Sequence, residues 1–258
     1  ENKFLLRFYK EKNFDLLVEL GTRIHLTNYT FEPPKQPSSF TMFLRKRLEN
    51  AVLKGIEQKN FDRIVFLELD KKEEYFLAIE MIGKGNLVLC DSQLNILLPL
   101  RREVFATRVI EKGARYEFPE KKLSPLELDA GKIMGLSGEL KQAITKIASI
   151  SSIYLEEACH RAGLNLDFKV EELTKEQAEE LAKAINSLLK ECSPTLYGEK
   201  PFAFAPFSLK KFSQENANKF NSFSEALDEY YANAPEQPVS AKQGKKASLL
   251  HSLQGQER

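Results

Sequence analysis

Several features that mark particular protein classes are scarce or missing. The 258-residue chain has no tryptophan and only three cysteines. It also contains no run of about 18 apolar residues, which argues against a membrane-spanning helix. The opening residues Glu1-Asn2-Lys3-Phe4 lack an apolar stretch, so we expect no signal peptide. Cys90, Cys159 and Cys192 are odd in number and lack C-x-x-C spacing, which argues against a disulfide framework or zinc site and indicates a cytoplasmic protein.

The signatures of common catalytic and cofactor sites are absent as well. No G-x-S-x-G occurs, and the segment Gly83–Asn86 has neither the dinucleotide fingerprint nor the P-loop pattern. We interpret this segment as a sharp strand connection, with ligand contact as the alternative. His25 and His160 have no neighbouring ligand at metal spacing, so both are predicted to be structural. We therefore expect no metal, no cofactor and no catalytic residues.

The first 120 residues are dominated by short apolar runs separated by polar turns. A helix is predicted from Ser38 or Ser39, with apolar residues at helical spacing and Gly55 just after its end. The predicted strands cover residues 4–8, 15–20, 23–27, 61–69, 75–82, 87–90 and 94–98. Several closely spaced strands with polar turns indicate an antiparallel sheet or sandwich.

A helical pattern begins near Ser124, which precedes Pro125 and a capping Glu127. Further helices are predicted over residues 139–150, 152–162, 175–191 and 224–231. The aromatic segment Pro201–Phe207 is expected to pack on the body of the protein. We therefore predict an α+β protein with four segments: a β-rich domain (1–122), a helical domain (123–194), a segment that packs back (195–234) and the start of a coiled coil (235–258).

The charge is unevenly distributed along the chain. Lys and Arg number 38 against 37 Asp and Glu, yet residues 1–60 hold 11 basic against 7 acidic residues. Seven cations fall in residues 35–63, namely Lys35, Arg45, Lys46, Arg47, Lys54, Lys59 and Arg63. This block fits either a solvated helix face or a phosphate-binding surface. Asp62-Arg63 likewise fits either an adjacent ion pair or an arginine that presents its planar donors to a phosphate or base.

Longer motifs resemble those of one known family, in order and over nearly the whole chain. They are Pro37–Asn50, Gln58 with Phe61–Val65, Ile79–Asp91, Tyr154–Gly163 and Phe223–Asp228. Together these motifs are similar to the N-terminal region of the NFACT family.

The resemblance implies both a fold and a function. The β-rich domain should resemble the N-terminal domain of formamidopyrimidine-DNA glycosylases, and the helical domain their helix-two-turn-helix domain. The implied function is a non-catalytic, cytoplasmic factor of ribosome-associated quality control. Such a factor binds tRNA and the large ribosomal subunit that carries a stalled peptidyl-tRNA, and supports mRNA-independent tailing of the nascent chain. The resemblance implies no membrane or DNA as partner.

The same resemblance assigns candidate residues for RNA contact. Asp62 and Arg63 match the pair that the family needs for tailing. Arg45, Lys46 and Arg47 match its basic helix. Lys35, Lys84 and Asn86 are further candidates for RNA contact. The family also carries an aspartate in a helix expected before Glu1, and a coiled coil and RNA-binding domain expected after Arg258, so we expect this chain alone not to support tailing.

Two other functions stay open at this point. A DNA glycosylase would share the implied fold, but fold similarity alone is a weak argument for chemistry, and the chain lacks the expected N-terminal proline. A fibronectin-binding surface adhesin is the second alternative. The missing signal peptide and the unpaired cysteines argue against it.

Overall fold

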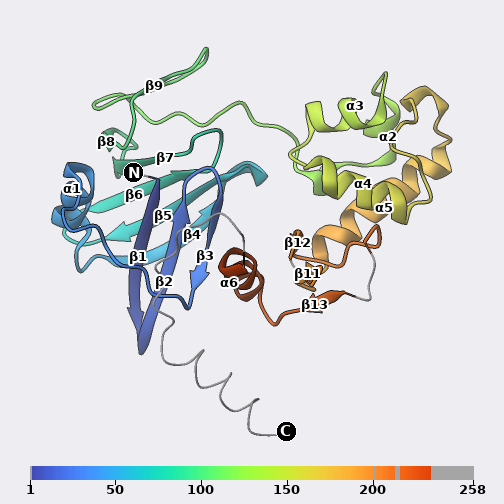
Figure 1. Cartoon of the computed structure of the whole chain (residues 1–258). Helices are drawn as coiled ribbons and strands as arrows, with labels where there is room; N and C mark the ends of the chain where they lie inside the picture. The colour runs from blue at the N-terminus through green and yellow to red at the C-terminus, as the bar shows by residue number, and fades with distance from the viewer. Residues whose placement is uncertain (1, 200, 213–215, 234–258) are drawn as a thin grey trace, which may run out of the picture. The chain divides into compact units, whose positions relative to one another are not determined.

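The computed structural model describes residues 2–199, 201–212 and 216–233 of the chain (Figure 1). Contacts divide these residues into two compact units. The first contains residues 2–57, 64–117 and 222–233, and the second contains residues 58–63 and the described part of 118–221. Helices and antiparallel strands occur in both, which confirms the predicted α+β class. The finer division into four segments stays a prediction.

The first unit begins with a three-stranded antiparallel sheet. Its strands are β1 (Lys3–Lys10), β2 (Lys12–Glu19) and β3 (Arg23–Thr27), in that spatial order. Lys10 pairs with Lys12, so Glu11 alone makes the turn between β1 and β2 and adopts a left-handed backbone with φ of 60°. The three strands predicted here are confirmed: two from short apolar runs separated by a charged turn, and β3 from the alternation of polar and apolar residues over 23–27.

Helix α1 (Ser39–Leu48) begins where the sequence indicates and ends earlier. The Ser38 hydroxyl caps it by accepting a hydrogen bond from the Thr41 backbone N–H at 3.1 Å. The prediction that the helix runs on towards Gly55 is wrong. Asn50 adopts φ of 64°, which leaves the right-handed helical region, and Gly55 lies inside strand β4. The apolar residues after Asn50 therefore belong to a strand.

A second sheet of the first unit has five antiparallel strands in sequential order. They are β4 (Val52–Gln58), β5 (Ile64–Asp70), β6 (Glu74–Glu80), β7 (Asn86–Asp91) and β8 (Ile96–Pro99), followed by a ribbon of β9 (Glu103–Val104) and β10 (Val109–Ile110). The predicted hairpin is confirmed, since Asp70 pairs with Glu74 across β5 and β6. Its first strand begins later than predicted, because Phe61 belongs to a 3₁₀ turn, η1 (Lys59–Phe61).

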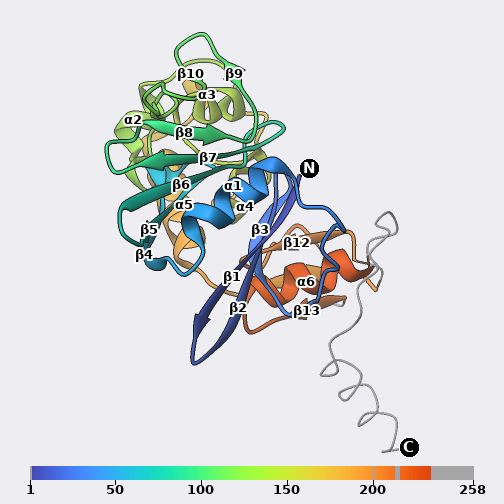
Figure 2. The ribbon, with the colours of Figure 1, turned by 90° about the vertical axis from the view of Figure 1, so that its left-hand side faces the viewer.

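The core of the first unit joins both sheets and α1. Its buried members are Phe4, Leu16, Val18, Leu20, Phe40, Leu44, Leu67, Leu69, Leu77, Ile79, Met81, Leu87 and Leu89. Figures 1 and 2 show α1 beside the five-stranded sheet. Next to this core, the buried Glu80 carboxylate accepts hydrogen bonds from Arg108 Nη1 (2.7 Å) and the Tyr116 hydroxyl (2.6 Å). Burial, together with this carboxylate, raises the pKa of Tyr116.

The second unit contains most of the helices. They are α2 (Ala130–Met134), α3 (Leu140–Ile147), α4 (Ser152–Arg161) and α5 (Lys175–Lys190), with 3₁₀ turns η2 (Pro125–Glu127) and η3 (Val170–Glu172). Leu140 and Ile144 on α3 and Leu181 and Ile185 on α5 are fully buried, as their i,i+4 spacing predicts. The helix expected at Ser124 is one capped 3₁₀ turn. The likeness of this unit to a helix-two-turn-helix domain stays a prediction.

A small sheet completes the second unit. Its strands are β11 (Thr195–Tyr197), β12 (Ala203–Ala205) and β13 (Ala217–Lys219), in the order β12-β11-β13. The Phe207 side chain is buried after β12, with its ring edge-to-face against Tyr154 of α4 at 4.8 Å. The aromatic segment 201–207 thus packs on the helices of its own unit.

The chain then returns to the first unit through α6 (Phe223–Asn233), which contacts β3 (Figure 2). The buried Asp228 carboxylate accepts hydrogen bonds from the Thr27 hydroxyl (2.6 Å) and the Asn28 backbone N–H (2.8 Å). His25 Nε2 lies 3.0 Å from the same carboxylate. These contacts fasten α6 to residues about 200 positions earlier in the chain. The coiled coil predicted for residues 235–258 lies outside the described residues.

Candidate nucleic-acid interface

The three cations of α1 occupy the last turns of that helix. Phe40 and Leu44 are buried and hold α1 against the core. Arg45 and Lys46 are exposed, while Arg47 is half-buried, with its guanidinium over the Phe43 ring at 4.2 Å from the centroid. This stack orients Arg47, and the cations also lie at the helix end that favours positive charge. The helix therefore carries three cations at its C-terminal end, two of them exposed and one held against an aromatic ring.

The turn between β4 and β5 places Asp62 and Arg63. It is closed by two hydrogen bonds, from the Asp62 backbone N–H to the Lys59 carbonyl and from Gln58 Nε2 to the Asp62 carbonyl, both at 2.8 Å. Asn60 and Phe61 both adopt left-handed backbone, with φ of 53° and 56°. Such a conformation is tolerated by asparagine and is strained for phenylalanine, by about 1–3 kcal/mol.

Asp62 fixes the backbone of Arg63 and leaves the guanidinium exposed. The Asp62 carboxylate accepts a hydrogen bond from the Arg63 backbone N–H at 2.7 Å. The two side chains do not form the adjacent ion pair that was the simpler interpretation of the sequence. Within the part of the chain that the structure describes, the Arg63 guanidinium has no hydrogen-bond or ion-pair partner. A planar donor fork of this kind binds phosphate or a base edge bidentately.

The turn at residues 83–86 is built for close packing. A Cβ on Gly85 would lie 2.7 Å from Leu20 Cβ and 2.8 Å from the Gly21 nitrogen, so only glycine fits there. Asn86 is fully buried, and its amide bonds the backbone of Arg101 through both side-chain atoms, at 2.8 and 3.1 Å. We therefore leave Asn86 out of the proposed contacts, because its polar atoms are used inside the fold. Lys84 is exposed.

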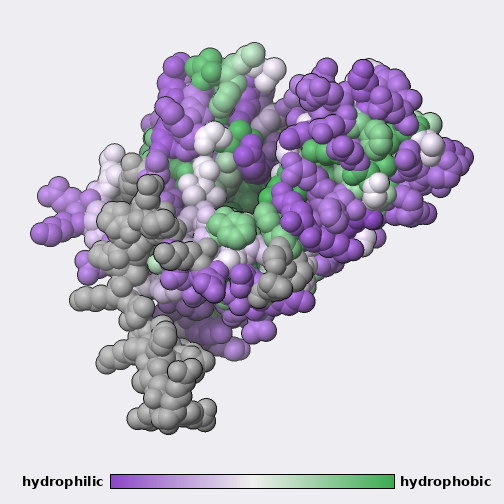
Figure 3. Space-filling model, turned by 45° about the vertical axis from the view of Figure 1, so that its right-hand side comes forward, coloured by the Kyte–Doolittle hydropathy of each residue, from purple (hydrophilic) through white to green (hydrophobic). Residues whose placement is uncertain are grey.

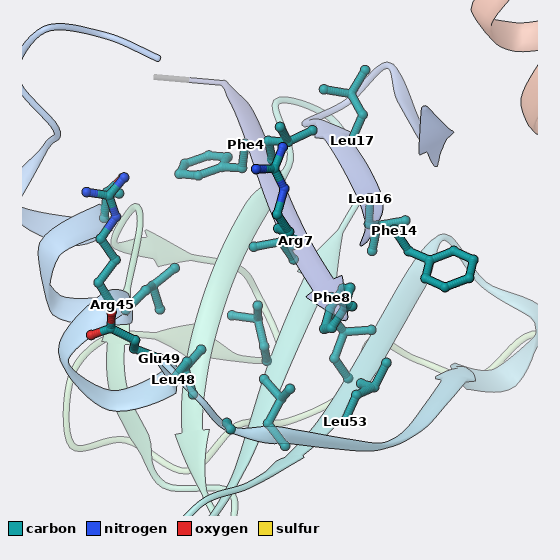
Figure 4. A pocket seen from close by; sticks show the side chains of 18 of the residues that line it. Phe4, Arg7, Phe8, Phe14, Leu16, Leu17, Arg45, Leu48, Glu49 and Leu53 are labelled. Atoms are coloured by element: carbon teal, nitrogen blue, oxygen red, sulfur yellow. The ribbon is translucent and has the colours of Figure 1, made fainter. Parts of the chain in front are cut away.

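A cavity of about 1700 Å³ opens in the first unit next to α1. Figure 4 shows apolar side chains from β1, β2 and β4 lining it, among them Phe4, Phe8, Leu16 and Leu53. Arg45 stands at its margin on α1 (Figure 4). Lys35, which is exposed in the segment before α1, also lines it. The cavity therefore combines an apolar lining with cations at its edge.

Exposed charge alone does not identify a binding site on this protein. Hydrophilic side chains cover most of the surface visible in Figure 3, and many surface cations already have acidic partners. Arg7 binds Asp15 through both Nε and Nη2, at 2.7 and 2.8 Å, and Arg102 binds Glu111 at 2.7 Å. Arg63 differs from Arg7 and Arg102 in having its donors available for a ligand.

The candidate residues for RNA contact are divided between the two units. Arg45, Lys46, Arg47, Lys35 and Lys84 belong to the first unit, whereas Asp62 and Arg63 cluster with the second. Among the described residues, no group of three or more His, Cys, Asp and Glu side chains is arranged to hold a metal ion. None of the described helices is both long and apolar enough to cross a lipid bilayer.

Two features of the site were missed by sequence reasoning. One is the left-handed backbone at Asn60 and Phe61, for which asparagine in a turn is a weak signal. The other is the stacking of Arg47 on Phe43, which follows from their i,i+4 spacing on the helix. On α1, Arg47 therefore packs against Phe43 at the edge of the buried face that Phe40 and Leu44 form.

Comparisons with known proteins agree with these motifs. A family model described as NFACT N-terminal and middle domains matches residues 1–256. The archaeal Rqc2 homolog aRqcH of Methanocaldococcus jannaschii is 35% identical over 84% of this chain and 35% of its own length. The ribosome quality control complex subunit NEMF of Homo sapiens is 28% identical over 94% of this chain and 26% of its own length.

Solved structures support the fold independently. The fibrinogen binding protein from Staphylococcus aureus superposes with a TM-score of 0.73 at 19% identity, over 89% of this chain and 88% of that one. At this identity the likeness shows the fold alone. The chain spans between about a quarter and about a third of the length of the two relatives above.

Proposed function

We propose that this chain is an RNA-binding portion of a factor of ribosome-associated quality control, because it belongs to the NFACT family. In this proposal it binds tRNA and the large ribosomal subunit that carries a stalled peptidyl-tRNA. It works in the cytoplasm and supports mRNA-independent extension of the nascent chain without catalysing a reaction itself. Since the chain spans only part of its relatives, the complete activity needs the remainder of the protein.

The observation that carries the proposal is the arrangement of Asp62 and Arg63. Arg63 is exposed, its backbone is fixed by the Asp62 carboxylate at 2.7 Å, and its guanidinium has no partner among the described residues. A fixed backbone reduces the conformational entropy that binding must overcome. This arrangement supports a role for Asp62 in positioning Arg63 and for Arg63 in contacting tRNA.

The cations of α1 are proposed to contact the RNA backbone. Arg45 and Lys46 are exposed, and Arg47 is held over the Phe43 ring. Phosphate contacts of this type position an RNA without reading its sequence, and they make binding sensitive to salt. Lys35 and Lys84 are exposed and are proposed as supplementary contacts.

The name of the Staphylococcus aureus neighbour does not support a second function here. That protein is called fibrinogen binding, and its 19% identity to this chain carries the fold alone. The adhesin hypothesis therefore has no supporting observation among the described residues.

Binding of tRNA by the full-length protein tests the proposal. We expect Arg63→Ala to weaken binding by about 5- to 150-fold, the effect of losing about 1–3 kcal/mol from a bidentate arginine contact. Wild-type affinity should also fall steeply between about 50 and 200 mM salt. Arg102→Ala is the matched control, because Arg102 is an exposed arginine already paired with Glu111. Equal affinities for the wild type and Arg63→Ala would refute the assignment of Arg63.

A further inference from the structure

Phe61 is an exposed aromatic residue in the turn that carries Arg63. The residue is 37% exposed, and its backbone has φ of 56°. A left-handed backbone is unusual for any residue with a bulky side chain, and glycine or asparagine would adopt it at lower cost. The turn thus holds a large apolar ring at the surface in a conformation that its residue type disfavours.

The hydrogen bonds of the turn keep Phe61 in this conformation. The Asp62 backbone N–H donates to the Lys59 carbonyl, Gln58 Nε2 donates to the Asp62 carbonyl, and Arg63 N–H donates to the Asp62 carboxylate. These bonds bracket Phe61 on both sides. Strain that is held in place by its surroundings is concentrated at binding and catalytic sites, where it pre-organises a side chain.

The chemistry beside Phe61 indicates what its ring would bind. Arg63, two residues further on, presents a guanidinium with no partner among the described residues, and the carboxylate of Asp62 lies between them in the chain. An apolar protein surface would have to desolvate these charges, which disfavours it as an occupant. An unpaired nucleobase suits both groups, because it offers a flat face for stacking as well as polar edges and a nearby phosphate for the guanidinium.

We propose that Phe61 is a stacking residue that holds one unpaired base of a bound RNA, while Arg63 bonds the edge or the phosphate of the same nucleotide. This inference rests on the proposed function and adds to it the part of the RNA that the turn recognises, an unpaired nucleotide. Stacking tolerates every base, because each has a π-face. Phe61 therefore contributes affinity for unpaired RNA without selecting among the bases.

The test combines affinity with a direct report of stacking. The probe is tRNA that carries 2-aminopurine in each unpaired region in turn, bound by the full-length protein. Phe61→Leu keeps an apolar side chain of similar size but removes the aromatic face, and Phe61→Tyr keeps that face. We expect Phe61→Leu to weaken binding by about 5- to 150-fold, the range for base–aromatic stacking, and Phe61→Tyr to bind as the wild type does.

The fluorescence of 2-aminopurine distinguishes stacking from a structural role. We expect the wild type and Phe61→Tyr to quench the probe at one unpaired region, and Phe61→Leu to leave it bright at saturating protein. Phe202→Leu is the matched control, because Phe202 is also an exposed phenylalanine of the second unit; it should bind and quench as the wild type does.

The outcomes separate this inference from the proposed function. If the wild type binds tRNA and Arg63→Ala weakens it, while Phe61→Leu binds and quenches normally, stacking by Phe61 is overturned and the proposed function stands. If the wild type does not bind tRNA at all, the proposed function is overturned and the inference with it.

Discussion

Removal of the Asp228 carboxylate should weaken the attachment of α6 to β3 within the first unit. Three groups depend on it: the Thr27 hydroxyl at 2.6 Å, the Asn28 backbone N–H at 2.8 Å and His25 Nε2 at 3.0 Å. Asp228→Ala leaves all three facing a buried space without an acceptor. Each buried donor that is left without an acceptor costs about 1–3 kcal/mol. With three such donors we expect a total loss of about 3–5 kcal/mol, near the lower end of their sum.

Hydrogen exchange provides the assay, because it reports the stability of α6 separately from the rest of the chain. We expect the free energy of opening for the α6 amides to fall by about 3–5 kcal/mol in Asp228→Ala. Thr27→Val removes one donor and should lower it by about 1–2 kcal/mol. Glu229→Ala is the control, since Glu229 is an exposed carboxylate on the same helix, and it should change exchange by less than about 0.5 kcal/mol. Unchanged protection of α6 in Asp228→Ala would show that this carboxylate does not hold α6 in place.

Two further predictions concern thiol reactivity and close packing. Burial raises the pKa of both Cys90 and Cys159 to about 12, whereas Cys192 is exposed. A maleimide at neutral pH should therefore label Cys192 alone in the native protein and all three cysteines after denaturation. Labelling of Cys90 or Cys159 in the native protein would contradict their burial. Gly83→Ala should destabilise by about 1 kcal/mol from its φ of 58° alone, since no atom lies within 4 Å of the added Cβ. In Gly85→Ala the added Cβ would lie less than 3.0 Å from three atoms, so this variant should lose about 1–3 kcal/mol more stability in urea unfolding than Gly83→Ala. Equal losses in the two variants would show that packing around Gly85 is loose.

The sequence predicted best those helices and strands whose apolar residues recur at a regular spacing. Strand β3 coincides with the alternating residues 23–27, and α5 with the apolar i,i+4 stripe between Thr174 and Glu191. The end of α1 could not be predicted, because the apolar residues after Asn50 fit a helix and a strand equally well. The backbone decides between them, because Glu49 leaves the helical region with ψ of 126° and Asn50 adopts a left-handed φ of 64°.

The candidate site was predictable in its residue types and not in its geometry. Asp62-Arg63 and the cations of α1 stand out in the sequence through charge and through resemblance to the NFACT motifs. The orientation of the Asp62 carboxylate towards the Arg63 backbone depends on the turn, which neither charge nor spacing encodes. Nor does the sequence show that Asn86, a polar residue in a glycine-rich turn, is buried with its side-chain amide bonded to the backbone of Arg101.

The proposed role in ribosome-associated quality control depends above all on contact between Arg63 and tRNA. Its most direct test is to cross-link RNA to the full-length protein in cells, purify the protein and sequence the bound RNA, for the wild type and for Arg63→Ala. We expect the wild type to enrich tRNA together with RNA of the large ribosomal subunit, and Arg63→Ala to lose most of the tRNA. Absence of tRNA from the wild-type sample, or its full retention by Arg63→Ala, would show that Arg63 does not hold tRNA in this role.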